Sequence, residues 1–230
     1  MSNQVMSNQV MSNWVMSTRL EPGTPPPHLE VAADPAALGV LGRDPRMRVL
    51  LETFGPYHWP LSPPFMALVR AVVGQLISGA AARATFNRLE AATAIDPERI
   101  LECSSDDLLA LGVPRRKGEY LQGLARYELE GGFSTLHTLS DAEVVARLIA
   151  LRGVGVWTAE MFLIFALGRP DVWPLADMGV VRAAERYYGA PTVPDIRSLG
   201  ERFCPYRSAA VWYLWRWTEA NPGRVKVGSG

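Results

Sequence analysis

Two glycines and one aspartate, separated by the length of one helix, are the residues of this sequence whose types and spacing could do chemistry together. Gly153 and Gly155 flank a valine in the segment LRGVGVWTA, and Asp177 follows the segment VWPLA. Glycines permit positive φ angles and remove side chains that would hold another molecule away, so the amide groups at the start of a following helix could bind a phosphate. A plain tight turn between two packed helices explains the glycines at least as well.

Asp177 precedes the segment MGVVRAAERYYG, which places it at the N-cap of a helix from Met178 to about Tyr188. Backbone amides and the helix dipole favour the charged carboxylate there, so we expect Asp177 to be ionised at neutral pH. An ionised carboxylate that faces a cleft can stabilise a positively charged transition state or accept a proton from water. Helix capping alone is the alternative role.

The sequence around the glycines predicts a helix-hairpin-helix unit. One helix ends at Leu151, the hairpin is residues 152–155, and a second helix runs from Val156 to about Leu167. The N–H groups and the dipole of the second helix would face a bound anion. Such a site adds no formal charge, which suits a chain with 23 basic and 23 acidic residues.

The rest of the ordered sequence also carries helical signals. Apolar residues between Phe65 and Ala80 recur at the spacing of one helix face, which predicts a helix over 62–92 with its first residue, a serine, as N-cap. Capping-box patterns that start at Ser104 and Ser140 predict two short helices. Strand signals are nearly absent, so the fold is predicted to be all-α.

Both ends of the chain are predicted to lack fixed structure. Residues 1–20 are an imperfect repeat of MSNQV, and the following segment EPGTPPPHLE is proline-rich. We therefore expect 1–33 to be a disordered repeat and linker, ordered structure to begin near Asp34, and 223–230 to be a flexible tail. The repeat could instead be a tail that binds a partner.

Composition argues against several classes of protein. Cys103 and Cys204 are the only cysteines, too few for a disulfide framework or a four-cysteine iron-sulfur cluster. No apolar run reaches the ~18 residues of a membrane span, and the N-terminus lacks the pattern of a secretory signal. We therefore expect a cytoplasmic protein that does not contact a membrane.

The segment LRGVGVWTAEMFLIFALGRPDVWPLADMGVVRAAERYYG resembles the helix-hairpin-helix DNA glycosylase superfamily, whose pattern is Leu-x-Gly-x-Gly-x-x-Thr-Ala followed by a proline-associated Asp. The chain looks most like the 3-methyladenine DNA glycosylase II branch. This closer resemblance rests on AVVGQLISGAAA, LGVPRRKGEYLQGLA and PYRSAAVWYLW, at residues 71–82, 111–125 and 205–215.

The resemblance implies a two-lobed helical bundle with a cleft between the lobes. The central lobe would be residues 65–170, which contain the hairpin, and the other lobe would combine 34–64 with 171–222. Some members of the branch have a longer N-terminal segment with its own β-sheet, for which the region before Phe65 is too short and too rich in proline. The chain would therefore be a compact version of the fold.

For the site, the resemblance implies that Asp177 is the catalytic carboxylate. The phosphate-binding hairpin would consist of Gly153, Val154 and Gly155 together with Thr158. In family members the backbone of this hairpin often holds an alkali cation, so a sodium or potassium ion is expected there, without any other metal or cofactor.

The resemblance also implies a pocket for a flipped base, formed by Trp157, Met161, Met178 and Gln75. Leu76 matches the apolar wedge that fills the gap left by an extruded nucleotide. Core packing is the alternative role for Trp157, and ordinary burial on the apolar stripe is the alternative for Leu76. Some branch members carry aromatic residues where this chain has the two methionines, which leaves the preferred base open.

Position 157 bears on the reaction class, because glycosylases of the superfamily that also cut the strand carry a lysine there. Trp157 in its place implies a monofunctional enzyme. The function implied is hydrolysis of the N-glycosidic bond of alkylated purines such as 3-methyladenine and 7-methylguanine in double-stranded DNA, as the first step of base excision repair. The enzyme would act as a monomer, associated with the nucleoid.

Two alternative functions are compatible with the sequence. The first is a glycosylase for a deaminated, oxidised or etheno-bridged base, since the shape of the pocket decides the substrate. The second is a catalytically silent helix-hairpin-helix module that binds damaged DNA or recruits partners, with Asp177 only as a helix cap. The aromatic run WYLWRW at 212–217 could be a docking face in that case, although its spacing favours a buried helix.

Overall fold

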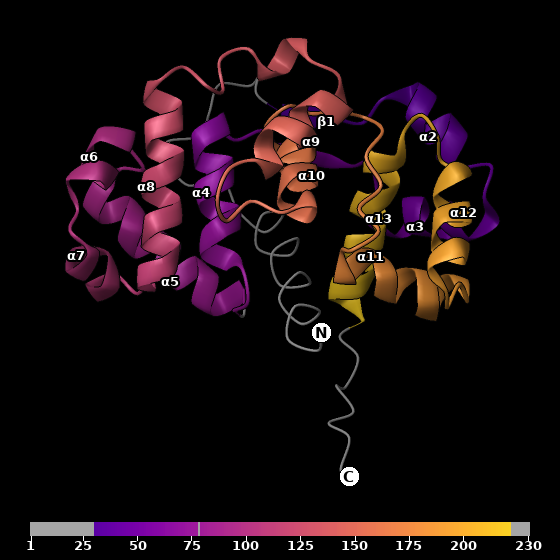
Figure 1. Cartoon of the computed structure of the whole chain (residues 1–230). Helices are drawn as coiled ribbons and strands as arrows, with labels where there is room; N and C mark the ends of the chain where they lie inside the picture. The colour runs from indigo at the N-terminus through magenta and orange to yellow at the C-terminus, as the bar shows by residue number, and fades with distance from the viewer. Residues whose placement is uncertain (1–29, 78, 222–230) are drawn as a thin grey trace.

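The computed structural model describes residues 30–77 and 79–221, with residues 79 and 80 described as backbone only. The N-terminal repeat and the segment 223–230, which were predicted to lack fixed structure, lie outside the described residues. The described part is built from helices joined by short loops (Figure 1).

The elements follow one another along the chain with two short strands and two non-α helical turns among them. They are β1 (Glu30–Ala32), α2 (Pro35–Leu41), α3 (Pro45–Phe54), β2 (His58–Pro60), α4 (Pro64–Gly74), α5 (Gly79–Thr93), α6 (Pro97–Glu102), α7 (Ser105–Ala110), α8 (Arg115–Leu129), the 3₁₀ turn η1 (Leu136–Thr138), α9 (Asp141–Ile149), α10 (Val156–Phe165), α11 (Met178–Ala183), the π turn η2 (Ala184–Tyr188), α12 (Val193–Glu201) and α13 (Arg207–Ala220).

The helical fold predicted from the sequence is confirmed, with one small sheet in addition. β1 pairs with β2 in antiparallel register, so that Val31 lies opposite Trp59. The prediction that residues up to 33 form a disordered linker is therefore wrong for 30–32. These residues are ordered because a distant segment offers them backbone partners and a buried tryptophan, which the local sequence does not reveal.

The helices form two groups. In Figure 1, α4 to α8 lie on one side, α2, α3 and α11 to α13 lie on the other, and α9 and α10 lie between them. α4 packs against α5, α8 and α10, whereas α13 packs against α3 and α11. Segments from the start and the end of the chain thus share one group. This arrangement resembles the predicted pair of lobes, whose exact boundaries stay a prediction.

α10 is the central helix of the molecule. From Trp157 to Phe165 every residue is buried except Glu160, which is half-buried. A helix that is apolar on nearly all sides belongs in the middle of a core. Its last residue reaches the second group of helices, because the Phe165 ring stacks on Trp215 of α13 with ring centroids 5.5 Å apart. The aromatic run of α13 is mainly buried, as its spacing favoured.

The single helix predicted over 62–92 is wrong, because α4 and α5 are separate helices. The N-cap of α4 is Pro63 rather than the serine before it. Between the helices, Leu76 has a φ of 62°, in the left-handed region that breaks a helix. The apolar stripe continues across the break, so its periodicity could not reveal it. By contrast, both predicted capping boxes are present, at the starts of α7 and α9.

Candidate active site

Asp177 is the N-cap of α11, as predicted, and its carboxylate is completely buried. Oδ1 accepts hydrogen bonds from the N–H of Val180 at 3.0 Å and from the indole Nε1 of Trp215 at 2.8 Å. Oδ2 accepts a third hydrogen bond from the indole Nε1 of Trp157 at 2.9 Å. The carboxylate is therefore held by three elements, α10, α11 and α13. The two indole donors could not be inferred from the sequence, since they come from distant segments.

Burial changes the electrostatics of this group from what we expected. Removal from water raises the pKa of Asp177, and the donors from Trp215, Trp157 and the α11 amides offset this only in part. This direction is opposite to the one that the helix end alone favours, because desolvation outweighs the hydrogen-bond donors. That Asp177 is ionised at neutral pH stays a prediction. A cation that comes to lie beside a desolvated carboxylate stabilises it strongly, because little water is present to screen the attraction.

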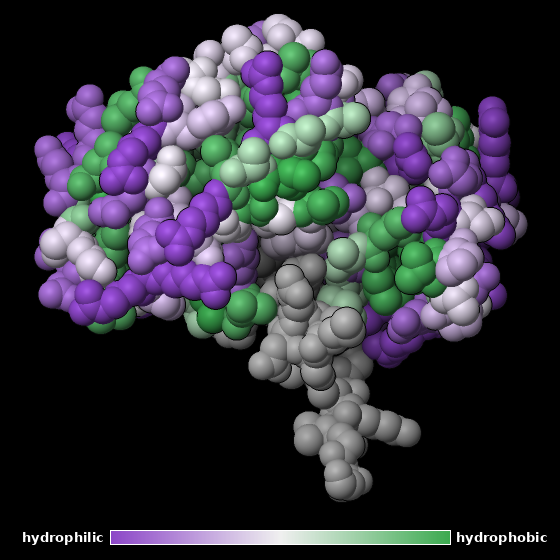
Figure 2. All heavy atoms as spheres, in the orientation of Figure 1, coloured by the Kyte–Doolittle hydropathy of each residue, from purple (hydrophilic) through white to green (hydrophobic). Residues whose placement is uncertain are grey.

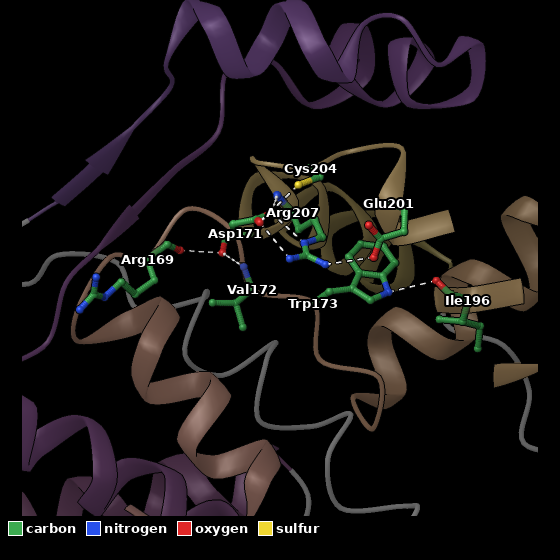
Figure 3. A network of polar contacts seen from close by, with 9 residues as sticks. Arg169, Asp171, Val172, Trp173, Ile196, Glu201, Cys204 and Arg207 are labelled. Atoms are coloured by element: carbon green, nitrogen blue, oxygen red, sulfur yellow. Dashed lines mark hydrogen bonds and ion pairs between the residues drawn. The ribbon is translucent and has the colours of Figure 1, made fainter. Parts of the chain in front are cut away.

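The chain that leads from α10 to Asp177 is fixed by a polar network (Figure 3). Asp171 and Arg207 form a bidentate ion pair. Nε of Arg207 donates to Oδ1 of Asp171 at 2.7 Å, and Nη2 donates to Oδ2 at 2.8 Å. Ser208 Oγ donates to the carbonyl of Arg169 at 2.7 Å and accepts from the N–H of Val172 at 3.0 Å. The segment 169–172 is thereby tied to the start of α13, which sets the path of the backbone toward Asp177.

The two glycines of the hairpin differ in backbone conformation. Gly153 has a φ of 91°, and a Cβ atom there would lie 2.3 Å from the ring of Tyr120. Gly155 has an ordinary φ of −103°, which does not require a glycine. A Cβ on Gly155 would meet nothing within 4 Å, because the glycine faces open space. Gly155 is the N-cap of α10, and no side chain caps that helix end.

The other two residues assigned to the hairpin are less exposed than a phosphate grip suggests. Val154 is 7% exposed, and its N–H donates to the carbonyl of Leu151 at 3.1 Å. Thr158 is 2% exposed, and its hydroxyl accepts a hydrogen bond from the Gln75 amide at 3.4 Å. The exposed residues at this point are Arg152 and Gly155 of the hairpin and the following Val156, which is 54% exposed.

The backbone of the hairpin also decides how well an alkali cation would fit. The carbonyl of Leu151 already accepts from Val154, and the carbonyl of Gly153 accepts from the Gln75 amide at 2.9 Å. Each carbonyl oxygen has a second lone pair, so a cation could still be held, but by partly engaged ligands. Among the described residues, no group of three or more His, Cys, Asp and Glu side chains could hold a metal ion.

Two of the four residues predicted to form the base pocket lie together. Trp157 and Met161 line a small cavity of about 10 Å³ between α4 and α10, together with Ser62, Ala67, Arg70, Ala71 and Phe165. This volume holds about one water molecule, so a purine could enter only if the cavity widened. Met178 is half-buried at the start of α11 and Gln75 binds the hairpin, so neither lines this cavity.

Leu76 is 61% exposed, which excludes the alternative that it is an ordinary core residue. It stands in the break between α4 and α5, next to the glutamine that reaches the hairpin. An exposed leucine with a positive φ is unusual in a soluble protein. This position is what a residue that enters a DNA duplex would need.

Glu160 is a residue of the site that the sequence analysis missed. It lies one turn after Trp157 on α10, and one of its carboxylate oxygens, Oε2, is buried with no hydrogen-bond partner. Burial and the nearby charge of Asp177 raise the pKa of Glu160 to about 8. The signal that could have revealed it is the single acid in the otherwise apolar helix VWTAEMFLIF.

Glu160 also lines a second and larger groove of about 480 Å³ between α9, α10 and the segment 171–173. Most of its walls are apolar, including Val145, Ile149 and Val156. Figure 2 shows hydrophobic surface over the region of α9 and α10, with hydrophilic side chains around it. No helix of the described part is long and apolar enough to cross a membrane.

Comparison with known proteins agrees with this geometry. Residues 69–205 match the model of the HhH-GPD superfamily of base excision DNA repair proteins. The chain is 31% identical over 195 residues to DNA-3-methyladenine glycosylase 1 of Schizosaccharomyces pombe. The alignment covers 79% of this chain and 86% of that protein. It is 30% identical over 159 residues to DNA-3-methyladenine glycosylase 2 of Escherichia coli, and this alignment covers 64% of this chain and 55% of that protein.

A solved structure supports the same relationship. The 3-methyladenine DNA glycosylase of Schizosaccharomyces pombe in complex with abasic DNA has a TM-score of 0.72 and 30% identity, and covers 81% of this chain and 97% of that chain. The two-lobed helix-hairpin-helix fold implied by the sequence resemblance is confirmed.

Proposed function

Because the chain belongs to the HhH-GPD superfamily of base excision DNA repair proteins, we propose that it is a monofunctional DNA glycosylase that removes alkylated purines from double-stranded DNA. Relatives with similarity over most of this chain are named DNA-3-methyladenine glycosylases. The observation that carries the proposal is the buried Asp177 carboxylate, held by indole N–H groups from α10 and α13.

The reaction needs a negative charge at the sugar more than an acid at the base. Alkylation at N3 or N7 makes the purine cationic and a good leaving group, so the base departs neutral while positive charge develops on the sugar. The Asp177 carboxylate stabilises this oxocarbenium-like state and orients the attacking water. Its burial increases the effect, since the carboxylate is poorly stabilised until a cation arrives.

The proposed mode of DNA binding needs no net positive charge on the chain. The open N-terminus of α10 at Gly155 and Val156 offers amide groups and the positive end of a helix dipole to a backbone phosphate. This mode of binding is compatible with a net charge of zero. The damaged nucleotide is flipped out of the stack, and exposed Leu76 fills the gap in the duplex.

The positions of the amines support the proposed absence of strand cleavage. Trp157 occupies the position of the lysine found in superfamily members that cut the strand, and its indole N–H is used by Asp177. Lys117, the one lysine in the described part of the chain, donates to the carbonyls of Val73 and Gln75 instead. We propose that the enzyme works as a monomer in the cytoplasm and needs no organic cofactor.

One experiment tests the whole proposal. Duplexes that each carry a single lesion, namely 3-methyladenine, 7-methylguanine, hypoxanthine, ethenoadenine or 8-oxoguanine, are incubated with the protein and scored for abasic sites with and without alkali. Release of the methylated purines, with strand breaks only after alkali, supports the proposal. Release of only a neutral lesion would favour a glycosylase for another base. Binding without any release would favour the silent module, for which the full burial of Asp177 as a cap is the supporting observation.

A further inference from the structure

Lys117 stands out because lysine is rare in this chain. Of the 23 basic residues only two are lysines, at positions 117 and 226, and Lys117 is the one within the described residues. Its side chain extends from α8 to the C-terminus of α4, where Nζ donates to the carbonyl of Val73 at 2.7 Å and to that of Gln75 at 2.5 Å. A compact ammonium group with three donors suits this pair of carbonyls better than the planar fork of an arginine.

The carbonyls that Lys117 binds belong to the break that presents Leu76. Gln75 is the C-cap of α4, and Leu76 follows it with a φ of 62°. A non-glycine residue in this conformation is strained, and the strain persists only where the surroundings hold the backbone in place. Lys117 supplies such a hold directly before Leu76.

A second hold comes from the opposite side. The side-chain amide of Gln75 donates to the carbonyl of Gly153 at 2.9 Å, which ties the break to the hairpin. The backbone before Leu76 is thus anchored to α8 through Lys117 and to the hairpin through Gln75. An exposed leucine on a backbone with two anchors keeps its direction when it is pressed into a duplex.

We infer that Lys117 is a positioning residue that holds Leu76 in the outward conformation needed to fill the gap left by a flipped nucleotide. This inference rests on the proposed function. Burial lowers the pKa of Lys117 to about 8, so the amine remains mostly protonated at neutral pH and keeps all its donors. Lys117 would contribute to opening the base pair and would have no part in breaking the glycosidic bond.

The test separates these two steps. The rate of single-turnover excision of 7-methylguanine is measured in a duplex with a normal base pair and in a duplex with an abasic site opposite the lesion. In the second duplex the lesion has no pairing partner, so little energy is needed to flip it. We expect Lys117→Met to slow excision from the normal pair about tenfold and to change the second rate by less than about twofold. Leu76→Ala should show the same pattern, and the double variant should be no slower than the worse single variant. Equal losses on both duplexes, or additive losses in the double variant, would overturn the inference.

Two further variants control for effects that do not depend on the position of Leu76. Arg126→Met removes an exposed positive charge from the same helix and should leave both rates unchanged. Lys117→Arg keeps donors near the carbonyls and should recover part of the lost rate, provided that its thermal unfolding matches that of the wild type. A rate for Lys117→Arg as low as that of Lys117→Met, in a stable protein, would count against the inference.

A binding measurement distinguishes failure of this inference from failure of the proposed function. 2-Aminopurine is placed opposite a stable abasic analogue, so that insertion of Leu76 unstacks it and raises its fluorescence without any excision. Wild-type protein should raise the fluorescence, and Lys117→Met should raise it less at saturating concentration. If no lesion is excised but this difference is present, the positioning role stands while the enzymatic proposal fails. If the two proteins give the same signal, the positioning role fails.

Discussion

The indole N–H of Trp157 lies 2.9 Å from Oδ2 of Asp177 and donates a hydrogen bond to it. This bond links the helix that follows the hairpin to the carboxylate one helix further along the chain. If a phosphate binds at the start of α10 and the sugar lies beside Asp177, as proposed above, Trp157 would connect the two positions through one buried side chain. The link also gives Trp157 a role beyond that of a wall for the base.

Removing the charge of Asp177 while keeping its shape should abolish base release. In Asp177→Asn the amide oxygen can still cap α11, but no negative charge faces the developing cation. We expect excision to fall by at least about 10²–10³-fold, as when an electrostatic partner of a transition state is lost. Duplex affinity measured by fluorescence anisotropy should change by less than about threefold, because binding depends on phosphate contacts. Excision at the wild-type rate would reduce Asp177 to a structural cap.

The hydrogen bond from Trp157 can be removed without removing the ring. Trp157→Phe should slow excision about 10–100-fold, the range expected for losing one hydrogen bond to a charged group. Loss of the donor should raise the pKa of Asp177 further, so the acidic limb of the rate profile should move to higher pH. Trp157→Ala should be slower still, with a smaller effect on affinity for undamaged DNA. Rates equal to those of the wild type in both variants would show that Trp157 is only core.

The features that local sequence encodes were predictable, and those that depend on packing were not. The capping aspartate, the hairpin and both capping boxes follow from patterns within a few residues. The carbonyls beside the break at Leu76 accept hydrogen bonds from Lys117, which comes 41 positions after Leu76 in the chain. The acceptor role of Asp177 toward both Trp157 and Trp215 likewise requires α10, α11 and α13 to meet.

The same distinction explains why the solvation of the site residues could not be predicted. Thr158 and Val154 share the hairpin motif with the glycines, but the motif does not say which side chains face inward, and both are buried. The ionisation of Asp177 was inferred from its helix end, whereas its pKa is governed by how much of the fold covers it. A pattern in the sequence gives the position of a group more reliably than its solvation.

The two hairpin glycines should respond differently to alanine. Gly153→Ala places a Cβ atom against the Tyr120 ring and forces a positive φ on alanine, so we expect a loss of stability of about 1–3 kcal/mol in thermal unfolding. Gly155→Ala should leave stability nearly unchanged, because its Cβ would face open space. It should nevertheless weaken binding to damaged and undamaged duplexes alike, since it obstructs a phosphate. A loss confined to one lesion type would contradict the phosphate grip.

Glu160 predicts a pH dependence of stability. Its pKa is raised to about 8 in the folded protein from 4.5, so the folded state binds more protons between these values. The free energy of unfolding should therefore fall as the pH rises through this window. Glu160→Gln should remove that slope and be more stable than the wild type by about 1–3 kcal/mol near pH 9, with little difference near pH 5. Parallel stability curves for the two proteins, from thermal unfolding across this range, would show that Glu160 is solvated.

We expect lesion preference to depend on how the small cavity beside Trp157 opens. Met161 is 4% exposed and lines this cavity of about 10 Å³, so a flipped purine must displace it or widen the space around it. Met161→Tyr adds volume to a filled site, which costs about 1–3 kcal/mol, and should slow excision of all lesions together with a lower melting temperature. Met161→Ala makes room, so excision of the bulkier ethenoadenine should rise relative to 7-methylguanine. Because leaving-group ability rather than shape drives release of cationic bases, 7-methylguanine should remain the faster substrate of the two. Competition between the two lesions in one reaction measures this ratio directly, and an unchanged ratio in Met161→Ala would place the base away from this cavity.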